Sequence, residues 1–522
     1  MTIPVDLLEQ PFNCVTDLIR LYAHERGDHL ALICNGRELS YAELDAHVDR
    51  FAASLQREGI VPCDAVALAA NASIEYVVAF LGALRAGAVV APLSPSSSAA
   101  SLAAMITNSG ARLLFLDAAV EQLLAPVAAD VKAKRMRIDE PDTLDAWLVA
   151  PDIRPARVDI DPAWGFNIIY SSGTTGTPKG IVQAHAMRWA YAVRSADRGY
   201  GPDAVTLIST PLYSNTTLVS FFPTLTLGGT ALVMPKFDVG GYLELAQRYR
   251  ATHTMLVPVQ YQRIMDYPEF DRYDLSSFRA KFSTSAPFAA RVKADVVKRW
   301  PGTLTEYYGM TEGGGSCELL AHAFPDKLHT VGTPITGHDI RLIDETGHEV
   351  ARGEIGEVVG HSPAMMTGYH NQPDKTAEAE WFDATGKRFI RTGDLGRFDE
   401  DGFLTLLDRK KDMIISGGFN VYPTDLEVEL RAHPDVYDVA VVGVPSQQWG
   451  ETPVAFVVLQ AKAAITERAL KDYANAKLGK MQRLADVVLI DAMPRSPIGK
   501  VLKRELRDHY AMLKQDQTCK TS

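Results

Sequence analysis

The sequence predicts an α/β protein: a large N-terminal domain of layered, mostly parallel sheets with a small β subdomain, followed by an α+β C-terminal domain. Short β-rich segments alternate with helical ones through most of the chain, which is typical of parallel sheets covered by helices. Hydrophobic residues make up 47% and charged residues 22% of the 522 residues. A sizeable core can therefore form, and wholesale disorder is excluded.

The N-terminal part is expected to begin with a hairpin and a helix. Asn35-Gly36 lies between two apolar runs and indicates a type I′ turn. Ser40 then fits a helix N-cap, and Glu43 completes a capping box. One apolar stripe follows at helical spacing, at Leu44, Val48, Phe51 and Leu55.

Seven further β-rich segments are expected as strands, at 66–70, 88–91, 112–116, 166–170, 205–209, 230–234 and 254–257. The most apolar stretch, 65–93, contains Glu75 and Arg85. It predicts a buried strand, helix and strand rather than a membrane span.

The pattern changes twice toward the C-terminus. Between about 339 and 407, short alternating strands and turns predict the small β subdomain. After 408–412, a helix near 424–432, strands near 439–444 and 454–459 and a helix at 467–477 predict an α+β unit of normal domain size. We therefore expect an N-terminal domain at 1–408 and a C-terminal domain at 409–522.

Composition argues against several classes of protein. The formal net charge of −11 disfavours nucleic acid as the main partner, because clustered Lys and Arg bind a phosphate backbone. Five cysteines without C-x-x-C spacing indicate reduced thiols rather than disulfides or a zinc site. The N-terminus lacks the pattern of a signal peptide and the last residues are no peroxisomal address. A cytoplasmic protein without stable membrane insertion is expected.

The strongest local signal is the segment 170–180, YSSGTTGTPKG. An apolar run leads into three glycines, five Ser/Thr hydroxyls and one lysine. Glycines let the backbone approach a ligand, successive N–H groups can form an anion nest, and Lys179 adds a positive charge. The segment lacks the G-K-[ST] of a Walker A loop, which disfavours a P-loop kinase or ATPase. A polar surface turn is the alternative, and the density of donors argues against it.

Four further segments agree with this loop in order and spacing: 307–312 (YYGMTE), 391–394 (RTGD), 408–412 (DRKKD) with Gly417 and Gly418, and 494–500 (PRSPIGK). Together the five segments resemble the signature of the adenylate-forming superfamily, which includes acyl- and aryl-CoA synthetases, adenylation domains of peptide synthetases, and luciferases. The resemblance extends from about Ser40 to Glu505. Taken singly, the four shorter segments would be better explained by buried tyrosines, an ordinary turn, a solvated charge run and a surface lysine.

The resemblance implies a site for ATP and Mg²⁺. Tyr308 would stack on adenine, Thr311 would contact the α-phosphate, and Glu312 would hold the metal, roles that suit an aromatic face, a hydroxyl and a carboxylate. Asp394, expected in a T-G-D turn, would accept hydrogen bonds from the ribose hydroxyls, and Arg409 would contact the nucleotide. The implied ATP/AMP-binding residues are Ser171, Ser172, Gly173, Thr174, Thr175, Gly176, Thr177, Lys179, Ser285, Ala286, Pro287, Glu306, Tyr307, Tyr308, Gly309, Met310, Thr311, Asp394 and Arg409.

The resemblance also implies two half-reactions. A carboxylate attacks the α-phosphorus of MgATP, releasing pyrophosphate and forming an acyl-adenylate; a thiol then attacks the activated carbonyl and releases AMP. Lys500, on a loop expected to be a flexible tether, would act with Thr311 and Glu312 in the first step by neutralising developing negative charge. The C-terminal domain would then rotate about the hinge residue Lys411. Ser416, Gly417 and Gly418 would line the path of the CoA thiol.

The acyl pocket is expected at Tyr213 and Ser214, and at Gly313 and Gly314 after the YYGMTE segment. Family members often have histidine where Ser214 stands, which leaves the gate of the pocket open to question. The run 313–315 either makes room for a ring or a long chain, or is only a turn. Neither chain length nor a choice between ring and chain follows from the sequence.

CoA is the expected thiol, because ISGGFNVYP and Trp449-Gly-Glu451 resemble CoA ligases more than luciferases. The expected activity is an AMP-forming ligase of a fatty or aromatic carboxylic acid and CoA. The alternative is a stand-alone adenylating enzyme that loads a carrier-protein thiol, since no carrier domain follows Lys500. A nucleotide sensor on this fold could dispense with Glu312 and Lys500, so the presence of both residues disfavours a sensor.

A lysine acetyltransferase acting on Lys500 is an expected regulator, and a homodimer is left open.

Overall fold

The computed structural model describes residues 5–171, 179–416, 419–479, 482–496 and 499–521. The backbone contacts divide the chain into two compact units. One comprises Met1–Ile340 and Gly360–Ile390, and the other comprises Arg341–Val359 and Arg391–Ser522. The domain boundary expected at 408 and 409 stays a prediction, and each unit is described separately.

A nine-stranded sheet in the order β15-β14-β13-β12-β11-β9-β10-β1-β2 lies in the first unit. Its strands are β1 Leu30–Cys34, β2 Arg37–Ser40, β9 Val205–Ile208, β10 Thr230–Val233, β11 His253–Leu256, β12 Ala280–Ser283, β13 Thr303–Gly309, β14 Ser316–Leu320 and β15 Thr333–Pro334. The inner strands pair in parallel, while β2, β14 and β15 pair antiparallel at the two ends.

A seven-stranded sheet in the order β18-β8-β7-β4-β3-β5-β6 lies in the same unit. Its strands are β3 Ala65–Ala69, β4 Val89–Pro92, β5 Leu113–Leu116, β6 Lys134–Arg137, β7 Gly165–Ser171, β8 Lys179–Ala184 and β18 Gly368–Tyr369. The four strands β3 to β6 are mutually parallel, and β7 joins them in parallel through β4. The seven strands expected from the sequence are all present, each shifted by no more than one residue at either end.

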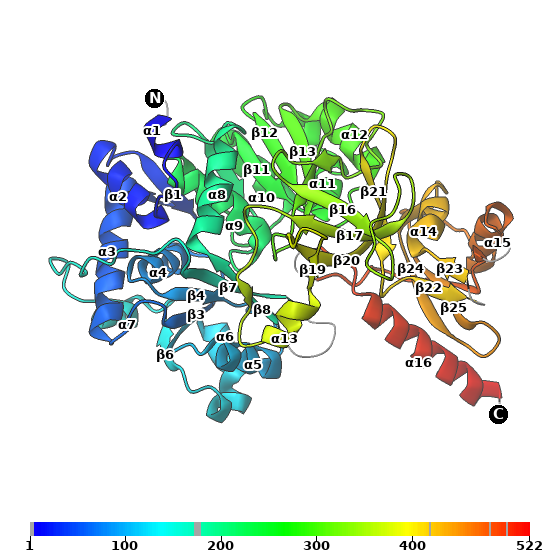
Figure 1. Ribbon diagram of the computed structural model, residues 1–522, viewed down its shortest axis with the longest axis horizontal. Coiled ribbons are helices and arrows are strands. Elements are labelled where there is room, and N and C mark those ends of the chain that lie inside the picture. The colour runs from blue at the N-terminus through cyan, green and yellow to red at the C-terminus, as the bar shows by residue number, and fades with distance from the viewer. Residues whose placement is uncertain (1–4, 172–178, 417–418, 480–481, 497–498, 522) are drawn as a thin grey trace. The chain divides into compact units, whose positions relative to one another are not determined.

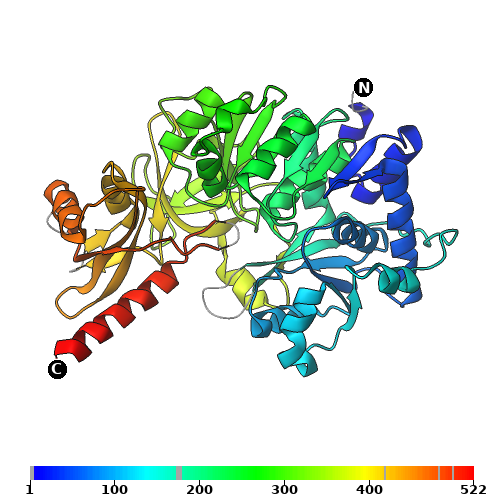
Figure 2. The same ribbon diagram turned by 180° about the vertical axis from the view of Figure 1, so that it is seen from behind.

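Helices cover both faces of these sheets (Figures 1 and 2). They are α1 Val5–Leu8, α2 Val15–Glu25, α3 Tyr41–Arg57, α4 Ile74–Arg85, α5 Ala99–Ser109, α6 Ala118–Leu124, α7 Pro141–Trp147, α8 His185–Ala196, α9 Asn215–Thr226, α10 Val239–Arg248, α11 Pro258–Met265, α12 Ala290–Arg299 and α13 Pro373–Glu378, with 3₁₀ helices η1 Ala125–Asp130 and η2 Phe270–Arg272. α8 packs on the seven-stranded sheet, α9 packs on the nine-stranded sheet, and the two helices pack on each other between the sheets.

The local signals at the start of the chain are confirmed. Asn35 and Gly36 have φ of 51° and 76°, as a type I′ turn requires. Ser40 and Glu43 form the expected capping box at the start of α3. The four residues of the expected apolar stripe are buried in the main core. Short-range chemistry therefore determines these elements.

A third sheet has the order β16-β17-β20-β19, with β21 paired to β20, and corresponds to the expected small β subdomain. Its strands are β16 Asp339–Ile343, β17 Gly356–His361, β19 Glu380–Phe382, β20 Arg388–Phe398 and β21 Leu404–Arg409. The T-G-D turn expected at Asp394 is wrong, because Thr392, Gly393 and Asp394 lie inside β20. Gly393 has a φ of 72° and its carbonyl accepts from Lys410 N, so this glycine bends a strand rather than ending it.

The C-terminal sheet has the order β23-β22-β25-β24, with β26 parallel to β25. Its strands are β22 Ile414–Ser416, β23 Phe419–Val421, β24 Val436–Ser446, β25 Gly450–Leu459 and β26 Asp486–Leu489, and the helices beside it are α14 Pro423–Arg431, α15 Glu467–Lys477 and α16 Lys503–Thr521. The expected α+β character is confirmed. Among the helices described, none is long and apolar enough to cross a lipid bilayer.

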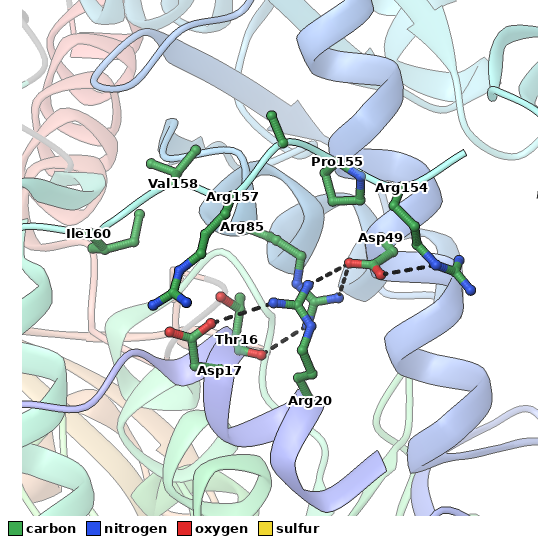
Figure 3. Close-up of a pocket in the computed structure, with 11 residues that line it drawn as sticks. Thr16, Asp17, Arg20, Asp49, Arg85, Arg154, Pro155, Arg157, Val158 and Ile160 are labelled. Atoms are coloured by element: carbon green, nitrogen blue, oxygen red, sulfur yellow. Dashed lines mark hydrogen bonds and ion pairs between the residues drawn. The ribbon is translucent and has the colours of Figure 1, made fainter. Parts of the chain in front are cut away.

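A cavity of about 260 Å³ lies where α2, α3 and α4 meet the segment 154–160 (Figure 3). Arg85, whose side chain is only 4% exposed, lies 2.8 Å from Asp49 and 2.6 Å from Asp45. Arg20 reaches Asp49 at 2.7 Å from the other side. The aspartates thus neutralise the buried arginine, and we interpret this cluster as the junction that ties three helices together.

We expect Arg85→Met to lower the free energy of unfolding by about 3 kcal/mol, because it leaves two aspartates without their buried cation. Arg157→Met is the matched control, since Arg157 lies on the same cavity but is 85% exposed. Its effect should stay below about 0.5 kcal/mol. Urea unfolding followed by circular dichroism measures both, and equal effects of the two variants would contradict the junction.

Candidate active site

Lys179 and Glu312, both predicted as site residues, contact the same tyrosine. β18 pairs antiparallel with β8, which places Tyr369 opposite Ile181 and beside Lys179, the first residue of β8. The Lys179 Nζ atom lies 5.0 Å from the centre of the Tyr369 ring. The Tyr369 hydroxyl donates a hydrogen bond of 2.9 Å to Glu312 Oε1. The structure thus joins the glycine-rich loop to the YYGMTE segment through one side chain.

Tyr369 was not predicted from the sequence. Its strand has only two residues, Gly368 and Tyr369, so the sequence contains no periodic pattern that could have found it. Burial and the neighbouring Glu312 carboxylate raise the pKa of Tyr369 above that of a free phenol. Tyr369 therefore stays a hydrogen-bond donor to Glu312 at neutral pH.

Several predicted phosphate-loop residues lie outside the described residues, namely Ser172, Gly173, Thr174, Thr175, Gly176 and Thr177. Ser171 ends β7 and pairs with Lys179 across the β7–β8 hairpin. The two ends of the loop are therefore held together by strand pairing.

The YYGMTE segment begins in β13, where successive side chains have different environments. Glu306 is buried and its Oε2 lies 2.5 Å from Lys293 Nζ, while burial raises the pKa of Glu306 against the opposing effect of that lysine. Tyr307 stacks on Phe282 with ring centres 5.9 Å apart. Tyr308, the next residue of β13, is only partly buried, and its predicted stacking on adenine stays a prediction.

The loop that follows β12 contains the predicted residues Ser285, Ala286 and Pro287. Ser285 has a φ of 84°, a region that non-glycine residues rarely occupy and that is enriched at functional sites. Its hydroxyl lies 2.5 Å from that of Thr216 in the first turn of α9. This contact joins the predicted nucleotide loop to the helix that follows Ser214.

The glycine run 313–315 is tightly packed against protein atoms. A Cβ atom on Gly313 would lie 2.0 Å from the Ala364 carbonyl oxygen, and one on Gly314 would lie 2.4 Å from Ile390. Both distances are too short for any side chain. Close packing therefore explains the two glycines, and their assignment to the acyl pocket stays a prediction. Tyr213, the first predicted pocket residue, is half-buried, and burial raises its pKa.

Asp394 and Arg409, both predicted to contact the nucleotide, are neighbours in the second unit. They face each other across β20 and β21, and Arg409 Nε lies 3.1 Å from Asp394 Oδ1. Beside them Glu357 lies 2.6 Å from Arg391 and 3.4 Å from Lys410. Burial acts to raise the pKa of Glu357, but the two cations bring it below its usual range. The predicted pair thus lies beside a network of fixed charges.

The predicted hinge residue Lys411 lies two residues after the end of β21, and partial desolvation lowers the pKa of its ammonium group. The next residue, Asp412, is 2.9 Å from Arg507 on α16. Ser416 is buried at the end of β22, while Gly417 and Gly418 lie outside the described residues.

Lys500 is exposed, and the described residues on both sides of 497–498 make contacts with each other. The expectation of a flexible tether stays a prediction. Ser496 N donates to the Lys500 carbonyl, Lys500 N donates to the Ser496 hydroxyl, and Arg495 forms an isolated antiparallel bridge with Val501. Arg495 also lies 2.6 Å from Asp438 on β24. The base of the loop is therefore attached to β24.

The carboxylates of the candidate site could hold the expected Mg²⁺ only if nucleotide phosphates supply further ligands. In the described ranges, no group of three or more His, Cys, Asp or Glu side chains is arranged to hold a metal. Mg²⁺ in nucleotide sites is commonly held by one or two carboxylates together with phosphate oxygens. Glu312, fixed by Tyr369, could supply such a carboxylate.

Comparison with known proteins agrees with these motifs. The model of the family "AMP-binding enzyme" matches residues 19–370, and that of the "AMP-binding enzyme C-terminal domain" matches residues 425–500. A 4-coumarate–CoA ligase of Nicotiana tabacum is 33% identical, over 91% of this chain and 90% of that protein. A fatty acid–[acyl-carrier-protein] ligase of Streptomyces coeruleorubidus is 32% identical, over 92% and 93%.

A solved structure extends this similarity to the fold. ATP-bound MatB from Rhodopseudomonas palustris superposes with a TM-score of 0.86 at 32% identity, over 95% of this chain and 99% of that one. A family model thus covers well over half of the chain, and the relatives are matched over nearly their whole length. The chain belongs to the AMP-binding enzyme family, which is the adenylate-forming superfamily that its five motifs resemble.

Proposed function

We propose that the protein is an AMP-forming ligase of a carboxylic acid and CoA, with fatty or aromatic acids as the substrate class. The observation that best supports a catalytic site is the Lys179–Tyr369–Glu312 contact, which places a cation and a carboxylate of two separate motifs on one tyrosine. The 4-coumarate–CoA ligase and the fatty-acid ligase among the relatives support the two substrate classes.

In the first half-reaction, we assign ATP binding to the phosphate loop with Lys179, to Tyr308, and to Asp394 with Arg409. Thr311 would contact the α-phosphate, and Glu312 with the phosphate oxygens would hold Mg²⁺, whose chemistry is to neutralise phosphate charge. The substrate carboxylate attacks the α-phosphorus in line and pyrophosphate leaves. Positioning and charge neutralisation account for most of the rate of such transfers.

In the second half-reaction, the CoA thiol attacks the acyl carbonyl of the adenylate and AMP leaves. We assign Lys500 to the first step only, and Ser416, Gly417 and Gly418 to the thiol path. The contacts that attach the base of the Lys500 loop to β24 support this division, because a residue held by its own domain would leave the site when that domain moves. Rotation would then occur about Lys411, between an N-terminal domain at 1–408 and a C-terminal domain at 409–522.

A carrier-protein thiol is the alternative acceptor and is less well supported, since the acyl-carrier-protein ligase among the relatives stands beside CoA ligases. Acetylation of Lys500 would remove the charge used in the first step, so a lysine acetyltransferase remains a proposed regulator. A homodimer and a cytoplasmic location stay predictions.

We expect AMP release from ATP to depend on both an acid and CoA when fatty, aryl and aryl-alkenoic acids are tested as a panel. The acids that support release would define the substrate class. Acid-dependent exchange of pyrophosphate into ATP without any CoA turnover would contradict the CoA ligase and favour the carrier-protein alternative. Absence of both activities with every acid would contradict adenylation of these acid classes.

We expect Lys500→Ala to reduce acid-dependent pyrophosphate exchange at least about a hundredfold, because removal of one electrostatic group at a reaction centre commonly has this effect. Thioester formation from preformed acyl-adenylate and CoA should change less than about threefold, since Lys500 is assigned no part in that step. Lys462→Ala is the control, an exposed lysine in the same unit. Equal losses in both half-reactions would contradict the two-conformation mechanism.

A further inference from the structure

Arg188 is a buried cation without a buried anion. It lies on α8 between the two large sheets and is only 2% exposed. Within the described part of the chain, no carboxylate forms an ion pair with it, and burial lowers the pKa of its guanidinium to about 10. Burial of an unpaired charge is costly, and an apolar side chain would fill the same space at less cost. Its presence therefore calls for an explanation beyond packing.

Two amide side chains and two aromatic rings surround this guanidinium. Asn167 Oδ1 accepts from Arg188 Nε at 3.1 Å and from Nη2 at 2.8 Å, and Gln183 Oε1 accepts from Nη2 as well. The rings of Phe166 and Phe222 lie 5.6 Å and 6.0 Å from the guanidinium carbon. Asn167 and Gln183 come from the neighbouring strands β7 and β8, so the cluster is built into the sheet.

These contacts determine the orientation of the Gln183 amide. A guanidinium can only donate, so Arg188 requires the oxygen of Gln183 to face it, and Asn167 Nδ2 donates to the same oxygen at 3.1 Å. The amide nitrogen of Gln183 must then point the opposite way. There it donates to the Thr311 carbonyl at 2.7 Å, with a longer contact of 3.4 Å to Asn215 Oδ1.

The Thr311–Glu312 turn is consequently held from β8 at two points. Lys179, at the start of β8, packs on Tyr369, which donates to Glu312. Gln183, four residues further along the same strand, donates to the Thr311 carbonyl. Asn215, which follows the predicted pocket residue Ser214, is the other acceptor of the Gln183 amide.

We propose that Arg188 is a positioning residue for adenylate formation: it orients the Gln183 amide, which holds the Thr311 carbonyl and thereby the Thr311–Glu312 turn against the phosphate loop. Arg188 itself touches no reacting group. This inference rests on the proposed function, because it requires Thr311 and Glu312 to act on the nucleotide. A cluster that served packing alone would not need the directed donor of Gln183.

Gln183→Glu tests whether the hydrogen bond from Gln183 to the Thr311 carbonyl supports catalysis. The carboxylate keeps the shape of the side chain and pairs with Arg188, but it cannot donate to the Thr311 carbonyl. We expect kcat of acid-dependent pyrophosphate exchange to fall about tenfold or more, which is the scale of one lost hydrogen bond near a charged site. The melting temperature should not fall. Gln122→Glu, at an exposed position on α6, is the matched control for the added charge.

Arg188→Met and Arg188→Lys test the cation itself. Methionine removes the donors and leaves the Gln183 amide free to turn, so kcat should fall at least about threefold, while KM for ATP and the melting temperature change little. Lysine keeps one donor toward Gln183 and should recover part of the lost rate. If an unpaired Gln183 impairs folding of the methionine variant, the double variant Arg188→Met with Gln183→Met provides an apolar cluster and should show the same loss of kcat.

Wild-type kcat in folded Gln183→Glu, or in the folded double variant, would overturn this inference and leave the proposed function intact. A loss of rate that only parallels a loss of thermal stability, with no recovery in Arg188→Lys, would overturn it in favour of a packing role. Absence of exchange in the wild-type protein with every acid of the panel would instead overturn the proposed function and this inference with it.

Discussion

The pairing of β18 with β8 is the interaction on which the candidate site depends. Tyr369 and Lys179 are far apart in the sequence, and this strand pairing is what brings them side by side. The pairing uses backbone hydrogen bonds over only two residues of β18, so its stability comes from the side chains around it. Met366 and Tyr369 pack against Ile181 and Ile390 in a small buried cluster that supplies this packing.

Strand β8 thus organises the site with its side chains as well as its backbone. It starts at Lys179, immediately after the phosphate loop, and reaches the Thr311–Glu312 turn through Tyr369 and through Gln183. Both contacts depend on hydrogen-bond direction: a phenol kept protonated by burial donates to a carboxylate, and an amide oriented by Arg188 donates to a carbonyl. A preorganised set of donors and acceptors of this kind is what phosphoryl chemistry requires.

The sequence predicted what local chemistry determines. The Asn35-Gly36 turn, the Ser40 capping box and the parallel strands were found because each has a short-range signal. Tyr369 was missed because a strand of two residues has no periodicity. Gly393 was taken as part of a turn because Thr-Gly-Asp is ordinary turn chemistry, whereas cross-strand pairing with β21 keeps it in a bent strand.

Buried residues whose neighbours are distant in sequence posed a different difficulty. Arg188 lies in a helix whose sequence reads as an ordinary amphipathic segment, and only the fold shows that its side chain is buried between Phe166 and Phe222. Glycines 313 and 314 were equally compatible with space for a ligand and with a turn, and only the fold shows that Ala364 and Ile390 pack against them. In both cases the decisive contacts come from segments distant in sequence, which composition and spacing do not reveal.

The most direct test of the central claim, that Tyr369 couples the two motifs, is acid-dependent pyrophosphate exchange by Tyr369→Phe in the absence of CoA. The variant keeps the ring beneath Lys179 and removes only the hydroxyl that donates to Glu312. We predict that kcat falls about tenfold or more with unchanged thermal stability, because a hydrogen bond to a charged group is lost at the site. Tyr249→Phe, at the C-terminal cap of α10, removes a tyrosine hydroxyl elsewhere in the protein and serves as the control. An exchange rate equal to that of the wild-type protein would contradict the account.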